Sequence, residues 1–302
     1  MERRRDHDRV DAGALTTLAC MANEKTRDEW ATAAEGWVRN ERLFDAVFSP
    51  FTAAVVGAAG LGSARRVLDV GCGTGALLVD AVAAGADAVG VDISPAMVEA
   101  ARRRVPTATV VTADAQTADL LAVAPGAPFD RVVSRFGVMF FADPEAAFAN
   151  IRSATAPGAR LAFVCWREGE TCTFSLGLRA LTARLTDPPI PPMPGAPGPM
   201  GLAKADRIRE VLTVAGWADV TIQPIDGLCD YAIDGSDGVE ERLAFALNAT
   251  FGRALRAALE PRLDPDGWQA AMDEARAELR GNLVNGAVRF VGHTWLVTAK
   301  NR

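Results

Sequence analysis

The stretch Val-Leu-Asp-Val-Gly-Cys-Gly-Thr-Gly at residues 67–75 decides the fold of this chain of 302 residues. An apolar run of this kind is typical of a buried parallel strand. Glycines directly after a strand allow positive φ angles and a close approach of the backbone to a ligand. A helix that begins at about Gly75 would point its N-terminal N–H groups at the same place. The stretch therefore predicts a strand–turn–helix junction that binds a nucleotide-like ligand.

The spacing of Gly71, Gly73 and Gly75 separates two kinds of ligand. Dinucleotide-binding folds use the pattern G-x-G-x-x-G, in which the start of the helix binds a pyrophosphate. Here the pattern is G-x-G-x-G, and Asp69 precedes it by two positions. A carboxylate at this place would repel a pyrophosphate, whereas it suits an ammonium group or another hydrogen-bond donor. The spacing therefore disfavours a nicotinamide-dependent oxidoreductase, which stays a rival hypothesis.

A second acid follows the next apolar run. Residues 88–94 are Ala-Val-Gly-Val-Asp-Ile-Ser, with Asp92 at the end of the run. A carboxylate at the end of the second strand can accept hydrogen bonds from both hydroxyls of a ribose. Ile93 would then lie against an adenine ring. Met97, on the first turn of the next helix, would either close over the adenine or ribose or pack in the core.

Residues 67–75 closely resemble the first motif of class I methyltransferases, which bind S-adenosyl-L-methionine. The resemblance implies that Asp69 helps to bind the amino-acid end of this cofactor and that the glycines make room for it. A third predicted strand, residues 108–112, is followed by Asp114 and Ala115. In the family, an acid here accepts a hydrogen bond from the exocyclic amine of the adenine, and the next backbone N–H meets a ring nitrogen. The resemblance carries these two roles to Asp114 and Ala115.

The fourth and fifth predicted strands extend the resemblance. Residues 129–141 are Phe-Asp-Arg-Val-Val-Ser-Arg-Phe-Gly-Val-Met-Phe-Phe, and a Pro-Gly pair precedes the fifth strand. This pattern resembles the ubiquinone/menaquinone C-methyltransferase-like branch of the class, in which the end of the fourth strand faces the methyl group. The candidates are Ser134 and Arg135 for the cofactor, and Phe136, Met139 and Trp166 for the methyl acceptor.

The resemblance also implies the fold class. It is an α/β protein with a Rossmann-like seven-stranded sheet in the order 3-2-1-4-5-7-6, with strand seven antiparallel and with helical lid insertions. Residues 220–223 and 288–299 are expected as strands six and seven. The connections 167–203 and 225–287 would then leave the edge of the sheet where ligands bind. Long connections at such an edge are commonly lids, so we expect both inserts to cover the active site.

The N-terminal part precedes the first strand. We expect a flexible tail over residues 1–23, and one methyltransferase domain over residues 24–302 that starts with a capping helix at 24–56. Trp30 and Trp37 lie on this helix, which in the resembling branch folds over the methionine end of the cofactor and the mouth of the acceptor site. Both are therefore candidate acceptor residues, with packing against the core as the alternative.

Composition and charge exclude several other classes of protein. The net charge of −6 argues against nucleic-acid binding, which usually needs a basic face. No apolar run reaches the roughly 18 residues of a membrane span, and no signal-peptide pattern is present. Five cysteines without a C-x-x-C pair argue against a metal site or a disulfide framework, and they favour the reducing cytoplasm. A homo-oligomer stays open.

The reaction implied by the cofactor is methyl transfer to a small molecule by in-line displacement, which mainly requires alignment and the exclusion of water. His293, near the start of the seventh strand, is the candidate base, and a histidine hydrogen-bonded beside the sheet is the other interpretation. Further candidates for an apolar pocket wall, with core packing as the alternative for most of them, are Trp166, Phe174, Phe245, Phe251, Trp268 and Phe290. Such a wall would favour a hydrophobic or aromatic acceptor of the quinol, polyketide or terpenoid type. The alternative hypothesis is a lyase or cyclase that binds the cofactor without transferring its methyl group.

Overall fold

A central sheet organises the computed structural model, which describes residues 12–168 and 175–302. Its seven strands have the order β3-β2-β1-β4-β5-β7-β6. β7 is antiparallel to both of its neighbours, and the first five strands are parallel. The predicted fold class, including the position and direction of strand seven, is confirmed. The strands are β1 (Arg66–Val70), β2 (Asp87–Asp92), β3 (Thr109–Thr112), β4 (Phe129–Arg135), β5 (Thr155–Trp166), β6 (Ala218–Asp230) and β7 (Arg289–Lys300).

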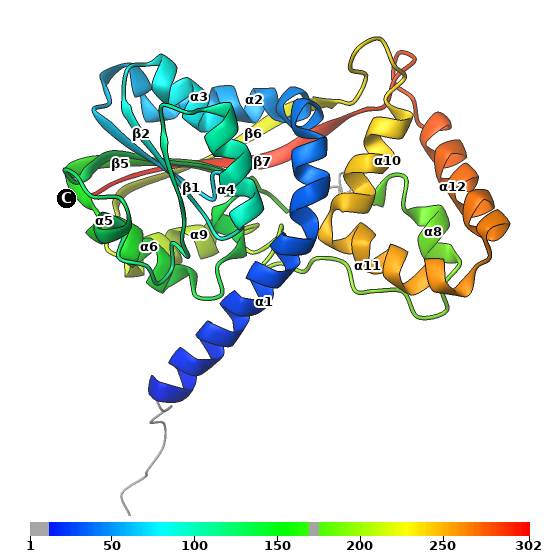
Figure 1. Ribbon diagram of the computed structural model, residues 1–302, viewed down its shortest axis with the longest axis horizontal. Helices are drawn as coiled ribbons and strands as arrows, with labels where there is room; N and C mark the ends of the chain where they lie inside the picture. Colours follow the sequence, from blue (N-terminus) through cyan, green and yellow to red (C-terminus); the bar gives the residue numbers. More distant parts are fainter. Residues whose placement is uncertain (1–11, 169–174) are drawn as a thin grey trace, which may run out of the picture.

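Helices cover both faces of the sheet, and a further group lies beyond its end (Figure 1). In the view of Figure 1, α2 and α3 lie above the sheet, and α6 and α9 lie below it. The group on the right consists of α8 from the first insert and α10, α11 and α12 from the second, which pack against one another. The long helix α1 runs between this group and the sheet. The helices are α1 (Ala12–Arg39), α2 (Glu41–Ala59), α3 (Ala76–Ala83), α4 (Pro95–Arg104), α5 (Leu120–Val123), α6 (Pro144–Ser153), α8 (Arg179–Ala183), α9 (Ala205–Val214), α10 (Val239–Asn248), α11 (Thr250–Leu259) and α12 (Pro265–Arg280), with short 3-10 turns η1 (Leu61–Ser63), η2 (Val138–Phe140) and η3 (Glu260–Arg262).

The helix α2 is apolar because one of its faces packs on the sheet. Its buried residues include Phe44, Phe48, Phe51 and Val55, and it contacts β4, β5 and β6. By length and composition alone, the segment Glu41–Ser63 is the one described helix that could cross a membrane, with a mean hydropathy of 1.5. Packing of the aromatic face against the sheet accounts for this composition.

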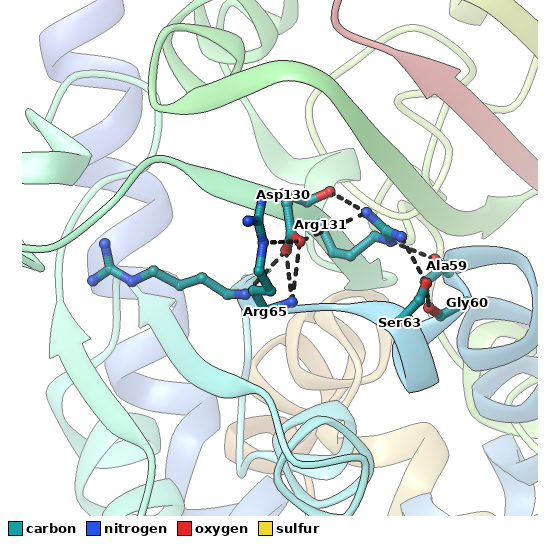
Figure 2. A network of polar contacts seen from close by, with 7 residues as sticks. Ala59, Gly60, Ser63, Arg65, Asp130 and Arg131 are labelled. Carbon is teal, nitrogen blue, oxygen red and sulfur yellow. Dashed lines mark hydrogen bonds and ion pairs between the residues drawn. The ribbon is translucent and has the colours of Figure 1, made fainter.

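The N-terminal ends of β1 and β4 are joined by a polar network (Figure 2). The Asp130 carboxylate accepts a hydrogen bond from the backbone N–H of Arg65 at 3.0 Å. Arg131 donates through Nε to the carbonyl oxygen of Ala59 at 2.9 Å and through Nη2 to the hydroxyl of Ser63 at 3.0 Å. The connection after α2 is thereby fixed to the sheet. β1 and β4 stay aligned, so their C-terminal ends open at the same edge.

The N-terminal helices differ from the expected boundaries. α1 begins at Ala12, inside the segment expected as a tail, and residues 1–11 lie outside the described part of the chain. Alanine and leucine are frequent over residues 12–20, and both favour a helix. The expected capping helix is divided at Asn40, whose side chain donates to the carbonyl oxygen of Gly36 at 2.8 Å. Asparagine competes for backbone hydrogen bonds in this way and so disfavours the helix interior.

The sixth strand is longer than the sequence predicts. It pairs with β7 as far as Asp230, which lies opposite Arg289, so the helical part of the second insert begins after Asp230. The arginine Nε donates to this carboxylate at 2.8 Å, and the contact stabilises the far end of the strand pair. The extended pair carries the second insert away from the sheet and toward α8.

Candidate functional site

A pocket opens where the C-terminal ends of β1, β2 and β4 meet. Its floor comes from these strand ends and the glycine turn, and its walls come from α1, α2, α10 and α11. Most of the residues predicted for a site line this one pocket. They are Asp69, Gly71, Gly73, Asp92, Ile93, Met97, Asp114, Ala115 and Arg135 on the cofactor side, and Trp30, Trp37, Phe136, Met139 and Trp166 on the acceptor side.

The glycine turn after β1 requires glycine for two different reasons. Gly71 has a φ of 65°, and a Cβ at this position would lie 2.8 Å from the Cα of Gly137. Gly73 has a φ of 54°, but a Cβ there would meet nothing within 4 Å. Gly71 therefore allows the two loops to touch. The open space at Gly73 faces the pocket, where a ligand can approach the backbone.

Asp69 is a buried acid with an unused acceptor. Its side chain lies at the end of β1 with 2% of its surface exposed, and its Oδ1 accepts no hydrogen bond from the described residues. Burial raises the pKa of Asp69 to about 8, the nearby Arg135 guanidinium lowers this pKa, and Asp92 raises it. A buried acceptor without a partner is costly. The site therefore favours a ligand that brings a donor, and a cationic donor most of all.

Asp92 holds the glycine turn and still has acceptor capacity. Its Oδ2 accepts from the backbone N–H of Gly73 at 2.9 Å, and its Oδ1 accepts from the backbone N–H of Ser94 at 2.9 Å. Burial raises the pKa of this carboxyl, while the backbone hydrogen bonds lower it. Each carboxylate oxygen has a second lone pair. Asp92 could therefore accept two further hydrogen bonds from adjacent hydroxyl groups.

Asp114 connects the sheet to α1. Its Oδ2 accepts from the Asn23 side chain at 2.7 Å, and its Oδ1 accepts from the backbone N–H of Gln116 at 2.9 Å. Asn23 is 7% exposed and lines the pocket. The sequence carries no local signal for this contact, because the two residues are 91 positions apart. The middle of α1, which bears Asn23, thus lies over the end of β3.

Two residues predicted for the cofactor have structural positions instead. Ser134 is fully buried, its hydroxyl donates to the carbonyl oxygen of Val70 at 2.7 Å, and it accepts from the backbone N–H of Gly137 at 3.2 Å. Gly75 caps α3, and a Cβ there would lie 3.3 Å from the Cβ of Ala101. Neither residue lines the pocket. Ser134 links the ends of β1 and β4, and Gly75 permits close packing of α3.

The structure places the candidate base, His293, away from the pocket. Its Nδ1 lies 2.8 Å from Oδ1 of Asp226, the residue directly opposite on β6, and 3.2 Å from Nη2 of Arg167. Side chains alternate between the two faces of a strand. The neighbour Gly292 faces Trp166, so His293 faces the opposite side of the sheet.

An aromatic wall faces the strand ends. The Phe136 and Trp166 rings stack with centroids 4.4 Å apart and an interplanar angle of 12°, and the Trp37 ring stacks on Phe44 at 3.9 Å. Phe136 has a φ of 64°, an unfavourable conformation for a residue other than glycine. Phe48 also lines this wall, 5.1 Å from the Phe136 ring. The strained backbone of Phe136 thus turns its ring onto Trp166 inside the pocket.

Some wall residues were missed by sequence reasoning, and others were wrongly grouped with them. Phe48 follows Phe44 by four positions, so the helical spacing of aromatics on α2 was an available signal. The mouth of the pocket between α1 and α11 is polar, and no local sequence motif predicts it. Of the other aromatics predicted for the wall, Phe245 lines the pocket, Phe174 lies outside the described residues, and three do not line it: Phe251, Trp268 and Phe290. The additional polar residues at the mouth are Thr26, Glu29, Asn248, Thr250 and Arg253.

The pocket presents groups that suit an organic ligand. Within residues 12–168 and 175–302, no three His, Cys, Asp or Glu side chains are grouped so that they could bind a metal. The pocket instead presents three acids at three neighbouring strand ends and an open backbone turn. These groups fit a ligand with a cationic or amine donor, a pair of hydroxyls and a flat ring.

Known proteins share this part of the chain. Residues 67–158 match a family model described as a methyltransferase domain. The demethylmenaquinone methyltransferase of Thermus thermophilus is 40% identical over 100 residues, which are 32% of this chain and 45% of that protein. The aklanonic acid methyltransferase DauC of Streptomyces sp. is 32% identical over 131 residues, which are 41% of this chain and 58% of that protein. The chain spans about half the length of the curated relatives that it matches.

A solved structure shares the fold. The YcgJ protein from Bacillus subtilis superposes with a TM-score of 0.51 at 16% sequence identity, covering 83% of this chain and 98% of that one. The family match begins at the second residue of β1 and ends early in β5. It therefore includes the strand ends with the three acids and Phe136, and it leaves out Trp166 and the parts of the wall that come from α1 and α2.

Proposed function

We propose that this chain, which carries a class I S-adenosylmethionine-dependent methyltransferase domain, moves the methyl group of that cofactor to a small hydrophobic or aromatic molecule. The observation that carries the proposal is Asp69, whose buried Oδ1 has no donor among the described residues beside an open glycine turn. An amino acid's ammonium group would supply that donor. A pyrophosphate would instead bring a negative charge to a buried carboxylate.

The other strand ends supply the remaining contacts of the proposed cofactor site. Asp92 would accept from the two ribose hydroxyls with its free lone pairs. Asp114 and the backbone N–H of Ala115 would pair with the adenine, with Ile93 and Met97 against its faces. All of these residues line one pocket, which supports their assignment to one ligand.

The aromatic wall supports the proposed class of acceptor. Trp30, Trp37, Phe136, Met139 and Trp166 line the part of the pocket between the strand ends and the second insert. When bound, the cofactor supplies a methyl group that is already electrophilic, so the chain mainly has to align the acceptor and exclude water. The relatives' names give demethylmenaquinone and aklanonic acid, both of which are consistent with a flat apolar pocket.

The same pocket supports a proposal for the domain organisation. We propose one domain in which α1 and α2 cap the site and the two inserts cover it, because residues from all four parts line the pocket, namely Trp30, Phe48, Pro199 and Phe245. This arrangement encloses the acceptor between the N-terminal helices, the inserts and the sheet.

The direct test is methyl transfer with cofactor labelled in its methyl group. The acceptors should include a reduced demethylated naphthoquinone, an aromatic polyketide acid and a terpenoid, with a polar amine as the matched contrast. We expect label in at least one apolar acceptor and none in the amine. Tight binding of the cofactor without transfer to any acceptor would instead favour the lyase or cyclase alternative.

The cofactor site has its own prediction. Asp92→Ala should weaken the binding of S-adenosylhomocysteine by at least about tenfold, because hydrogen bonds to a charged group are worth roughly 1.5–3 kcal/mol. Calorimetric titration measures this change. The control is Asp28→Ala, which removes an exposed acid of α1 and should leave the affinity unchanged. An unchanged affinity in Asp92→Ala would remove this residue from the site.

A further inference from the structure

We propose that the Arg135 guanidinium receives the carboxylate of the cofactor's amino-acid tail and that Asp45 of α2 is a positioning residue that holds it in place. The inference rests on the proposed function and adds a partner for the second charge of the tail. The sequence predicts Arg135 as a cofactor residue at the end of the fourth strand, without a specific role. The structure adds the side chains that surround its guanidinium.

Three residues of α2 form a seat for Arg135. Its Nη1 donates to the hydroxyl of Thr52 at 2.8 Å, and its Nη2 lies 3.4 Å from Oδ1 of Asp45. The guanidinium carbon lies 5.6 Å from the centroid of the Phe48 ring. These α2 residues are three and four positions apart, so they lie on one face of the helix. The Arg135 side chain is 13% exposed and lines the pocket.

The contacts with α2 leave N–H donors of the Arg135 guanidinium available for a ligand. An arginine side chain has five N–H donors in a planar fork. The contact with Asp45 is longer than the roughly 2.7–2.9 Å of a charge-assisted hydrogen bond. The Asp45 carboxylate is also shared, because its Oδ2 accepts from Nη2 of Arg104 at 2.5 Å. The guanidinium is therefore oriented by α2 without being fully neutralised.

Asp69 and Arg135 provide a buried carboxyl group and a buried guanidinium beside the glycine turn, and a bound ammonium group would favour the charged form of Asp69. Burial lowers the pKa of Arg135, whereas Asp45 and Asp69 raise it. Arg135 in turn lowers the pKa of Asp69. An α-amino acid has an ammonium and a carboxylate on adjacent atoms. With the ammonium at the unused Oδ1 of Asp69, the carboxylate can pair with the fork of Arg135 in a bidentate way.

The test compares three ligands by calorimetric titration of the full chain. S-adenosylhomocysteine has the carboxylate, its decarboxylated analogue retains only the amine, and 5′-methylthioadenosine lacks the whole amino-acid tail. In Arg135→Met we expect the affinity for S-adenosylhomocysteine to fall at least about tenfold. The affinity for the decarboxylated analogue should change less than about twofold, because its tail has no carboxylate for Arg135.

The positioning residue is tested by a double-mutant cycle. Asp45→Asn should weaken the binding of S-adenosylhomocysteine more than the binding of the decarboxylated analogue. When it is combined with Arg135→Met, it should have no further effect on the affinity for either ligand. Arg104→Met removes the other partner of Asp45 and is the control, for which the ratio of the two affinities should stay as in the wild type.

The inference fails if Arg135→Met weakens the binding of S-adenosylhomocysteine and of its decarboxylated analogue equally, or weakens the binding of neither. The role proposed for Asp45 fails if Asp45→Asn still weakens the binding of S-adenosylhomocysteine in the Arg135→Met background. In both cases the proposed function survives, provided the wild type binds the ligands. If the wild type binds none of the three, the proposed function and this inference both fail.

Discussion

At the scale of single residues, Asp69 couples the charge of the pocket to pH. The pKa of about 8 in the folded protein lies above the roughly 3.9 of an exposed aspartate. Between these values the folded state keeps a proton that the unfolded chain releases. The stability that this proton contributes is complete below about pH 4, and it is lost as the pH rises through about 8.

This behaviour gives a prediction for the ligand-free protein. Asp69→Asn removes the titration, so its free energy of unfolding relative to the wild type should increase from pH 5 to pH 8.5. Urea unfolding at several pH values between these limits measures the difference. A difference between the two proteins that stays constant over this range would contradict the raised pKa of Asp69.

Individual site residues differ in how well the sequence can place them. Asp69, Asp92 and Asp114 follow three parallel strands, and parallel strand ends meet at one edge, so their convergence was predictable. The structural role of Ser134 was not predictable, because its hydroxyl donates to a carbonyl oxygen on another strand. His293 faces away from the pocket because of the register of β7, which depends on pairing with distant strands.

At the scale of helices and strands, the pocket mouth depends on a close contact between α1 and α10. A Cβ on Gly36 of α1 would lie 2.2 Å from Oδ1 of Asn248, which lines the pocket. A Cβ on Gly57 of α2 would meet nothing within 4 Å. A comparison of alanine substitutions at these two glycines therefore distinguishes the effect of the added methyl group on packing from its effect on helix propensity.

The second prediction compares alanine at these two positions. Gly57→Ala should raise the free energy of unfolding by up to about 1 kcal/mol, because alanine favours a helix more than glycine does. Gly36→Ala should gain less or lose stability, since Asn248 must move away. Thermal unfolding of the two variants provides the measurement. An equal gain at both positions would mean that the contact between α1 and α10 is not close.

The sequence predicts local elements better than their ends. The Ser94-Pro95 start of α4 was visible in the sequence, and the structure begins the helix at Pro95. The extension of β6 to Asp230 was not visible, because it depends on the distant Arg289, whereas the break at Asn40 involves only the nearby Gly36 and had the local signal of an asparagine. The order of the strands was predictable only through the family resemblance.

At the scale of the whole molecule, the ligand site links the N-terminal helices and the second insert to the sheet. A ligand that binds only the folded state should stabilise all of these elements together. S-adenosylhomocysteine at 100 times its dissociation constant should add about 2.7 kcal/mol. For a chain of this length we expect the midpoint of thermal unfolding to rise by roughly 4 °C.

The same measurement separates the two cofactor hypotheses. NAD at an equal concentration should leave the unfolding midpoint unchanged, because its pyrophosphate would meet Asp69 and Asp92. A shift with NAD and none with S-adenosylhomocysteine would favour the nicotinamide oxidoreductase. The experiment does not require a known acceptor.

The strand β7 completes the sheet between two strands that the ribosome has already released. Until it emerges, the apolar edge of β5, whose residues from Leu161 to Cys165 are fully buried in the finished fold, has no neighbour on that side. An unpaired apolar edge can pair with another nascent chain. A chain that stalls before residue 289 would therefore be a client for chaperones and proteases, even though its glycine turn and acids are already made.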